Sequence, residues 1–185
     1  MLDQLVLLNL PSGSEVSIKE EGSVFILKTC QRTLLLSMNE EEFPNQAPTM
    51  LGKDAYAFLL QIICGLQSKL VGENEIVSQF KQAYKEFSAT PDKCTKLLLV
   101  LEKLFKDAKE IRTKYLLGLS QKTYSSLTRK HILKFKAEKV LIIGSGQLAE
   151  DLINQFKKKC TVYISARNSE RVKELASTHN IEIIK

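Results

Sequence analysis

The chain has 185 residues, of which 44% are hydrophobic and 26% are charged, as in ordinary globular proteins of one or two domains. No apolar run approaches the roughly 20 residues that cross a bilayer, and the N-terminus lacks the basic stretch of a signal peptide. The four cysteines are widely spaced and form no CxxC pair, which argues against a disulfide framework and against a metal site. We therefore expect a cytoplasmic protein with no membrane partner.

The net charge of +6 is unevenly distributed along the chain. Residues 1–92 hold seven Lys/Arg and twelve Asp/Glu (−5), residues 93–139 hold thirteen and four (+9), and residues 140–185 hold seven and five (+2). The basic segment 93–139 either faces a polyanion or forms a solvated, lysine-rich helix face, and charge alone does not separate the two.

The N-terminal part of the chain is typical of an α+β domain that ends in helices. Short apolar runs predict strands over 4–10, 15–19 and 24–37, and an acidic loop with two prolines and room for a short strand follows at 39–54. Helical periodicity then takes over. The predicted helices run from Asp54 to about Cys64, from Glu73 to Phe87, from Asp92 or Thr95 to Gly118, and over 121–135.

From Lys139 onward the pattern changes to strand, helix, strand, helix, strand, which predicts the first half of a doubly wound, Rossmann-type domain. Gly144, Gly146 and Ala149 form a GxGxxA turn between a buried strand and a helix. Gly144 permits the tight turn, Gly146 allows close approach of a pyrophosphate, and Ala149 lets the helix lie near the sheet. The alternative is a tight turn that binds no ligand.

The second strand of this region ends without the acidic residue that holds the ribose of NAD. Ser165 and Arg167 stand there instead, and a guanidinium can pair with a 2′-phosphate, which favours NADPH unless Arg167 is a solvated loop residue. The predicted cofactor-binding residues are Gly144, Ser145, Gly146, Gln147, Leu148, Ala149, Ser165 and Arg167.

The run "FILKTCQRTLLLSM", residues 25–38, places a thiol close to a guanidinium. In one extended strand Cys30 and Arg32 would point to the same face, so that Arg32 could stabilise a thiolate or bind an anionic group beside it. Alternatively, Cys30 is a small buried hydrophobic residue, which is the commoner state of a cysteine in a strand.

Four segments of the chain, which begin at Thr29, Gly65, Phe105 and Val140, carry motifs in an order that resembles one family. That family is glutamyl-tRNA reductase, which begins tetrapyrrole (haem) synthesis from glutamate. "TCQRT" resembles the family's "TCNRTE", and "GLQSKLVGENEIVSQFKQAY" resembles its "GLDSxxxGExQIxxQxKxAY". "FKDAKEIRTKYLLG" resembles a helix end with "VRTxTxIG", and "VLIIGSGQLA" with "SARNSERVKELA" is similar to the NADPH-binding segment. The resemblance covers roughly residues 24–178.

The resemblance implies a catalytic mechanism. The thiolate of Cys30 would attack the ester carbon of glutamyl-tRNA to form a thioester, which hydride from NADPH would reduce to glutamate-1-semialdehyde. Thr29 and Arg32 would line the pocket, Ser68 and Glu73 would hold the glutamyl group, and Glu75 would supply a further carboxylate. The expected partners are glutamyl-tRNA, bound partly by the basic segment, and the aminomutase that consumes the semialdehyde. As a helix cap is the commoner use of Ser and Glu at such a place, that alternative stays open for Ser68 and Glu73.

This sequence departs from the family pattern near the substrate pocket. Phe58 stands where the family usually has His, Leu34 replaces a Glu, and Glu75 replaces a Gln. Phe58 and Leu34 favour an alternative in which the chain is a non-catalytic tRNA- or nucleotide-binding or regulatory homologue. A third possibility is an NADP-dependent oxidoreductase of a small substrate.

The expected domains are a catalytic α+β domain over 1–118, a connecting helix over 119–136, and the N-terminal part of the NADPH-binding domain over 137–185. A complete doubly wound sheet has about five or six strands, so this domain is expected to be incomplete. The helical domain through which the family forms homodimers is also expected to be absent. We therefore expect weak or no NADPH turnover from the 185-residue chain alone.

Overall fold

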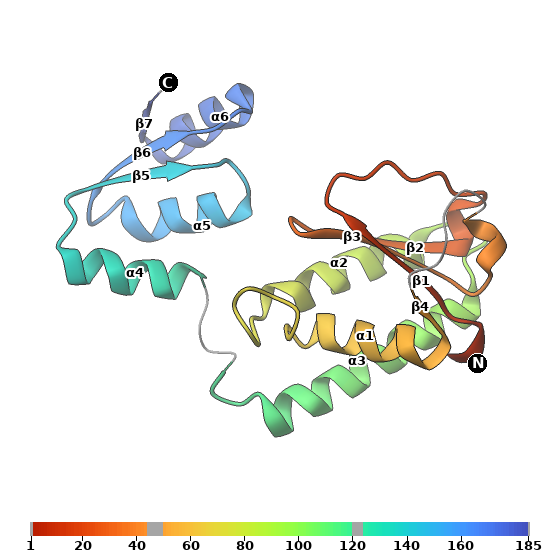
Figure 1. Ribbon diagram of the computed structural model, residues 1–185. Coiled ribbons are helices and arrows are strands. Elements are labelled where there is room, and N and C mark those ends of the chain that lie inside the picture. The colour runs from red at the N-terminus through yellow and green to blue at the C-terminus, as the bar shows by residue number, and fades with distance from the viewer. Residues whose placement is uncertain (1, 44–49, 120–123, 185) are drawn as a thin grey trace. The chain divides into compact units, whose positions relative to one another are not determined.

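The computed structural model describes residues 2–43, 50–119 and 124–184, and the chain divides into two compact units (Figure 1). Unit 1 comprises residues 1–121 and unit 2 comprises residues 122–185. Unit 1 is an α+β domain with an antiparallel sheet, and unit 2 contains a parallel sheet with the alternating strand and helix order of a half Rossmann fold. The predicted fold class is therefore confirmed.

The sheet of unit 1 has four strands in the order β2-β3-β1-β4, and every neighbouring pair is antiparallel. The strands are β1 (Val6–Pro11), β2 (Val24–Lys28), β3 (Arg32–Ser37) and β4 (Met50–Leu51). Leu7, Leu36 and Phe25 lie on one rung of the sheet and belong to the same buried cluster. The neighbouring rung of Leu8, Leu35 and Ile26 belongs to a second cluster, because successive side chains of a strand point to opposite faces.

Three helices supply the other half of the main core of unit 1: α1 (Gly52–Ile63), α2 (Glu75–Ala89) and α3 (Thr95–Tyr115). Phe25 of β2 is fully buried, and its ring lies 6.3 Å from that of Phe80 and 5.9 Å from that of Phe87, both on α2. This aromatic contact fixes α2 against the sheet. Three short 3-10 helices complete the described secondary structure of the unit: η1 (Leu2–Gln4), η2 (Glu21–Ser23) and η3 (Glu40–Glu42).

Two of the predicted strands are wrong. Residues 24–37 form a hairpin and not one strand, because the chain turns back between Lys28 and Arg32. Residues 15–19 form no strand. Their alternating pattern arises because Val16 and Ile18 pack on the second face of the sheet, next to Leu8 and Leu35, without pairing as a strand.

The helices of unit 1 lie close to their predicted ranges, but their ends differ. Helix α1 begins before Asp54, α2 begins after Glu73, and α3 ends at Tyr115, three residues before Gly118. The N-cap of α3 is Cys94, which lies between the two predicted capping residues. Glu73 therefore belongs to the loop before α2, which matters for the site described below.

Unit 2 begins with α4 (Tyr124–Phe135), the described part of the helix predicted over 121–135, whose first three residues lie outside the described ranges. It continues with β5 (Lys139–Ile143), α5 (Gln147–Phe156), β6 (Thr161–Ser165), α6 (Ser169–His179) and β7 (Glu182–Ile183). The strands are parallel, in the order β5-β6-β7. The core lies on one face of this sheet, where Ile142 and Ile164 meet Ile153 of α5 and Leu175 of α6.

Within the described ranges, none of the helices has the length and apolar character that crossing a membrane requires.

Candidate active site

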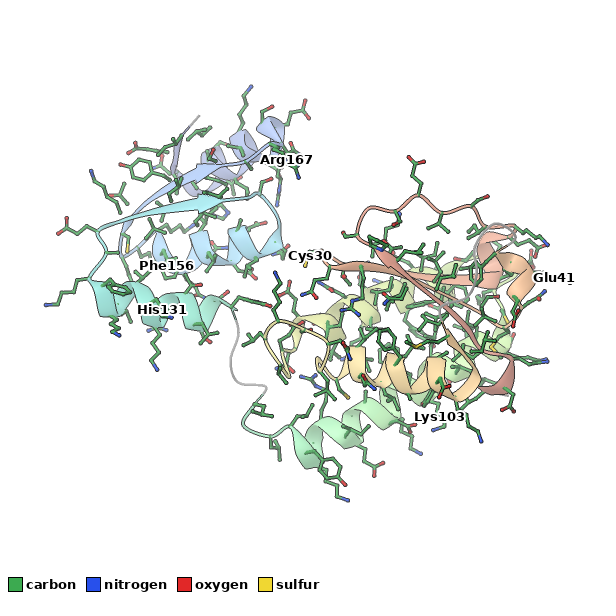
Figure 2. All side chains as sticks on the ribbon, in the orientation of Figure 1. Cys30, Glu41, Lys103, His131, Phe156 and Arg167 are labelled. Atoms are coloured by element: carbon green, nitrogen blue, oxygen red, sulfur yellow. The ribbon has the colours of Figure 1, made fainter. Side chains whose placement is uncertain are left out.

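Cys30 lies at the tip of the β2–β3 hairpin, in a turn that hydrogen bonds close tightly (Figure 2). The Thr29 hydroxyl donates to the carbonyl of Arg32 at 3.0 Å and accepts from the backbone N–H groups of Gln31 and Arg32 at 3.2 and 3.0 Å. The Ser12 hydroxyl donates to the Thr29 carbonyl at 2.9 Å. Thr29 therefore holds the backbone around Cys30 in place.

Cys30 is the exposed one of the chain's four free cysteines. Cys64 is buried in the main core of unit 1, and burial raises the pKa of its thiol. Cys160 of unit 2 donates to the carbonyl of Ala137 at 3.2 Å. A thiol must be accessible and ionised to attack an acyl group, so exposure singles out Cys30 as the candidate nucleophile.

The segment between α1 and α2, which we call the 64–74 loop, carries two of the predicted substrate-binding residues. The Ser68 hydroxyl donates to one carboxylate oxygen of Glu73 at 3.2 Å, and the other oxygen of Glu73 accepts from the backbone N–H of Glu75 at 2.7 Å. The two residues that were predicted to hold the glutamyl group therefore contact each other. Glu73 also serves the N-terminus of α2, which is the role that the capping alternative assigns to it.

Gly65 closes the 64–74 loop. Its carbonyl accepts from the N–H of Gly72 at 3.0 Å, and its φ of +73° is a conformation that few residues other than glycine adopt. A Cβ atom at this position would lie 3.0 Å from both the backbone nitrogen and the backbone oxygen of Glu73. The loop therefore has a fixed shape that depends on the absence of a side chain at residue 65.

Arg32 connects the hairpin to the 64–74 loop. Its guanidinium donates to the carbonyl of Gln67 at 3.2 Å, next to Ser68 in the chain. Because Cys30 lies in the turn, the predicted common strand face for Cys30 and Arg32 does not exist. The structure nevertheless brings the Cys30 turn and the Ser68–Glu73 loop together, through this contact between Arg32 and Gln67.

The two positions that depart most from the family pattern lie in or against the main core of unit 1. Leu34 is fully buried, and Phe58 of α1 is partly buried and packs against the same core. The expectation that Leu34 lies near the substrate pocket does not fit its buried position. In this chain a carboxylate at residue 34 would be surrounded by apolar side chains.

The motif analysis passed over one further residue near this loop, Arg112 in the last turn of α3. Its guanidinium donates to the carbonyl oxygens of Ile63, Gly72 and Glu73, at 3.3, 2.9 and 3.1 Å. It also donates to the side-chain oxygen of Asn74. The sequence held one signal, since Arg112 belongs to the "IRTKY" stretch that resembles the family motif, but a cation at a helix end is ordinarily explained by the helix dipole.

The glycine turn of unit 2 has the backbone geometry that a pyrophosphate requires. Gly144 has a φ of +126°, and its N–H donates to the carbonyl of Ser165 at 2.8 Å, which joins the ends of β5 and β6. Gly146 is the N-cap of α5, and no atom lies within 4 Å of the place where its Cβ would stand. Among the described residues, no acceptor is found for the N–H groups of Gly146, Gln147 and Leu148.

A helix N-terminus with free N–H donors and open space above a glycine fits a nucleotide phosphate. Ala149 is buried against the core of unit 2, as its predicted packing role requires. Arg167 follows the end of β6 and is exposed (Figure 2). Ser165 is the last residue of that strand. The described residues of this turn therefore fit a dinucleotide, and Arg167 is an exposed cation two residues after the end of β6.

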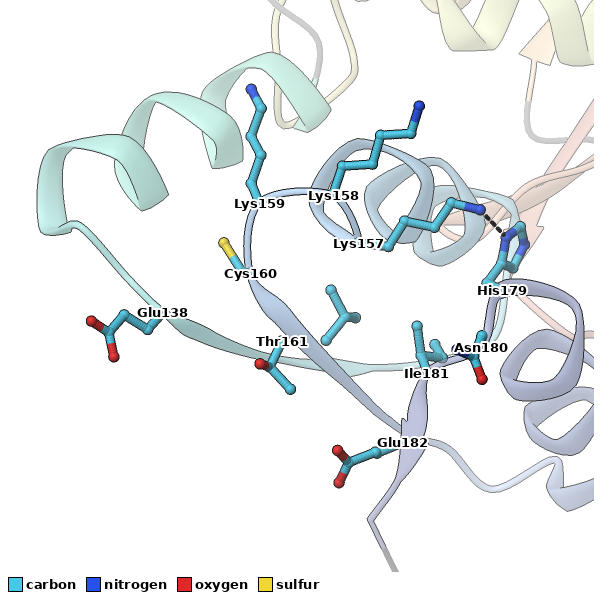
Figure 3. A pocket seen from close by; sticks show the side chains of 11 residues that line it. Glu138, Lys157, Lys158, Lys159, Cys160, Thr161, His179, Asn180, Ile181 and Glu182 are labelled. Atoms are coloured by element: carbon cyan, nitrogen blue, oxygen red, sulfur yellow. Dashed lines mark hydrogen bonds between the residues drawn. The ribbon is translucent and has the colours of Figure 1, made fainter.

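A separate cavity of about 670 Å³ lies at the opposite edge of the same sheet, near the first residues of β6 and β7 (Figure 3). Lys157, Lys158 and Lys159 line it, and Lys157 contacts the Nδ1 atom of His179 at 3.1 Å. Nucleotides bind beyond the carboxyl ends of parallel strands, and this cavity is at their amino ends. The lysines instead lie next to the C-termini of α5 and α6, where cations offset the helix dipoles.

Comparison with known proteins identifies the family. A sequence profile described as the N-terminal domain of glutamyl-tRNA(Glu) reductase matches residues 10–115, more than half of the chain. The chain belongs to the glutamyl-tRNA reductase family. A second profile, that of shikimate/quinate 5-dehydrogenases, matches residues 126–185.

Glutamyl-tRNA reductases from several organisms are similar to this chain. That of Thermoplasma acidophilum is 33% identical over 159 residues, which are 84% of this chain and 39% of the relative. That of Caldicellulosiruptor saccharolyticus is 28% identical over 182 residues, 89% of this chain and 46% of the relative. The chain thus spans less than half of the length of these curated relatives.

A solved structure supports the same fold. Glutamyl-tRNA reductase from Methanopyrus kandleri superposes with a TM-score of 0.59 and 18% identity, over 98% of this chain and 54% of that one. At this identity the match concerns the fold alone.

Proposed function

We propose that this member of the glutamyl-tRNA reductase family carries out the NADPH-dependent reduction of glutamyl-tRNA to glutamate-1-semialdehyde through a thioester on Cys30. The observation that carries the proposal is the exposed thiol at the tip of a braced hairpin, joined through Arg32 to the 64–74 loop. Family membership supplies the chemical context for this thiol.

In the first half of the reaction, the Cys30 sulfur attacks the ester carbonyl carbon that links glutamate to the terminal ribose of tRNA. The carbon–sulfur bond forms, the carbon–oxygen bond to the ribose breaks, and the ribose oxygen takes up a proton. Ser68 and Glu73 receive the glutamyl group, with the Glu73 carboxylate accepting a hydrogen bond from the substrate ammonium. The backbone held by Thr29 keeps the sulfur in one position during the attack.

The glycine turn of unit 2 would hold the dinucleotide, with the N–H groups at the start of α5 on the pyrophosphate and Arg167 on the 2′-phosphate. When bound, NADPH supplies the hydride that reduces the thioester to the aldehyde.

The tRNA would be bound partly by lysines of the basic segment. On α3, exposed lysines follow one another along the solvent face of the helix: Lys96, Lys103, Lys106, Lys109 and Lys114. Phosphate contacts of this kind act without sequence preference and weaken with rising salt. These lysines would therefore contribute to the affinity for tRNA, and not to the recognition of the glutamyl group.

The first half-reaction provides the sharpest test, because it needs no cofactor. The chain is incubated with tRNA charged with radiolabelled glutamate, and the protein is examined for label that hydroxylamine releases, as it does from a thioester. We expect label on the unaltered chain and none on Cys30→Ser. Cys94→Ser is the matched control, because Cys94 is a partly exposed thiol of the same unit. Absence of label from the unaltered chain, or equal label on Cys30→Ser, overturns the proposal.

A second candidate is a non-catalytic homologue that binds tRNA or nucleotide. Phe58 favours it, because a phenyl ring packed against the core offers no proton-transfer group where the family usually has an imidazole. In this case the chain binds glutamyl-tRNA in the same experiment but leaves the ester intact.

A further inference from the structure

The guanidinium of Arg112 spans the base of the 64–74 loop. It reaches from α3 to the carbonyl of Ile63 at the end of α1 and to the carbonyls of Gly72 and Glu73 just before α2. One side chain therefore ties the last residue of α1 and the last residues of the loop to a third helix. Arg32 holds the other side of the loop through the carbonyl of Gln67.

The contact requires an arginine. Its planar guanidinium presents five N–H donors in a fixed arrangement, whereas a lysine ammonium is a single point charge on a flexible stem. The carbonyls of residues 63, 72 and 73 converge on these donors, and the side-chain oxygen of Asn74 accepts as well. A single ammonium would satisfy only part of this set.

These contacts include the backbone of Glu73, the residue that is proposed to recognise the substrate ammonium. Arg112 holds the backbone oxygen of Glu73, while the carboxylate of Glu73 is held by Ser68 and by the N–H of Glu75. The position of the Glu73 carboxylate is thus fixed from both sides. A carboxylate that must meet an ammonium while the ester carbon meets Cys30 depends on such fixing.

We propose that Arg112 is a positioning residue that fixes the 64–74 loop so that Glu73 selects an acyl donor carrying an α-ammonium group. This inference rests on the proposed function, since it concerns how the same site recognises the glutamyl group. Arg112 acts through Glu73 and makes no contact with the reacting atoms.

The test compares two small acyl donors with the full chain, so that tRNA binding plays no part. One is an activated ester of the α-carboxyl group of glutamate, and the other is the corresponding ester of glutarate, which lacks the ammonium. Acylation of Cys30 by each is followed by mass spectrometry, and alkylation by iodoacetamide reports the accessibility of the thiol.

For Arg112→Gln we expect acylation by the glutamate ester to fall about 100-fold, the loss typical of a reactant misplaced by an ångström. Acylation by the glutarate ester and alkylation by iodoacetamide should change less than threefold. For Arg112→Lys, the rate of acylation by the glutamate ester should lie between the rates of the unaltered chain and of Arg112→Gln. Lys85→Gln is the matched control, because it removes an exposed cation of α2 that has no role in the proposed site, and it should behave as the unaltered chain.

Circular dichroism separates a positioning role from loss of the fold. The inference is overturned if folded Arg112→Gln keeps its preference for the glutamate ester. It is also overturned if acylation by both esters and alkylation by iodoacetamide fall to the same degree. If the unaltered chain accepts neither the glutamate ester nor glutamyl-tRNA, the proposed function itself fails, and the role of Arg112 fails with it.

Discussion

Two glycines, one in each unit, occupy turns of opposite character. Gly65 lies where a side chain would meet the backbone of Glu73 at 3.0 Å, so the space around it is filled by the chain itself. Gly146 lies where a side chain would meet nothing within 4 Å, so the space around it is open. Gly65 is therefore required for the fold of its loop, whereas Gly146 would be required only for the binding of a nucleotide.

The same contrast extends to the charged residues of the two candidate sites. Arg32 and Arg112 of unit 1 donate to backbone carbonyls of the 64–74 loop, while Arg167 of unit 2 is exposed at the end of a strand. Unit 1 therefore offers a site whose shape is set by its own contacts. Unit 2 offers donors and space that a ligand would complete. The following substitutions test this difference, from the largest expected effect to the smallest.

Gly65→Ala should destabilise unit 1 by about 3 kcal/mol, because it combines an unfavourable φ with a clash against backbone atoms that have little room to move. Denaturant unfolding followed by circular dichroism measures the change. Gly13→Ala is the matched control, since Gly13 has a similar φ of +80° with open space at its Cβ position, and it should cost only about 1 kcal/mol. Equal losses in the two variants would show that the loop yields to the added methyl group.

Gly146→Ala should leave the stability of unit 2 within about 0.5 kcal/mol, because its φ of −80° suits alanine and its surroundings are empty. The affinity for NADPH should fall at least about tenfold, since the methyl group stands where the pyrophosphate is expected. Calorimetric titration measures the affinity, and thermal unfolding measures the stability. An unchanged NADPH affinity would count against a nucleotide site at this turn.

Arg167→Gln should alter the choice of nucleotide and nothing else. We expect the preference for NADPH over NADH to fall by about tenfold, the effect of removing one charge-assisted contact to a phosphate. Stability should stay the same, because the exposed side chain makes no hydrogen bond or ion pair with the other described residues. A preference that survives in the variant would assign 2′-phosphate recognition to another residue.

Local sequence patterns were sufficient for the architecture of unit 2. Strand and helix alternate at a spacing that only a parallel arrangement satisfies, and the GxGxxA turn marks the first crossover. In unit 1 the apolar pattern misled the assignment of the hairpin. The residues on both sides of "TCQR" are almost uniformly apolar, because both faces of this sheet are buried, and so a turn that lacks glycine and proline left no mark in the hydropathy pattern.

The contacts that organise the candidate site depend on tertiary structure and could not be foreseen. Arg112 is 40 residues beyond Gly72, and Arg32 is 35 residues before Gln67. A motif locates each residue in the chain, but it does not say which carbonyl a guanidinium reaches. The proximity of Ser68 and Glu73 was predictable because both lie within one short loop.

The one-sided packing of the sheet in unit 2 has a practical consequence. Its core face is covered by α5 and α6, but Leu141 and Ile143 alternate with the buried residues of β5 and are 48% and 82% exposed. Parallel strands are ordinarily buried on both sides, and an open apolar surface of this kind adheres to dyes, to column matrices and to other copies. Assays of the chain will need low protein concentration or a mild detergent, so that aggregation is not mistaken for a loss of acylation or of nucleotide binding.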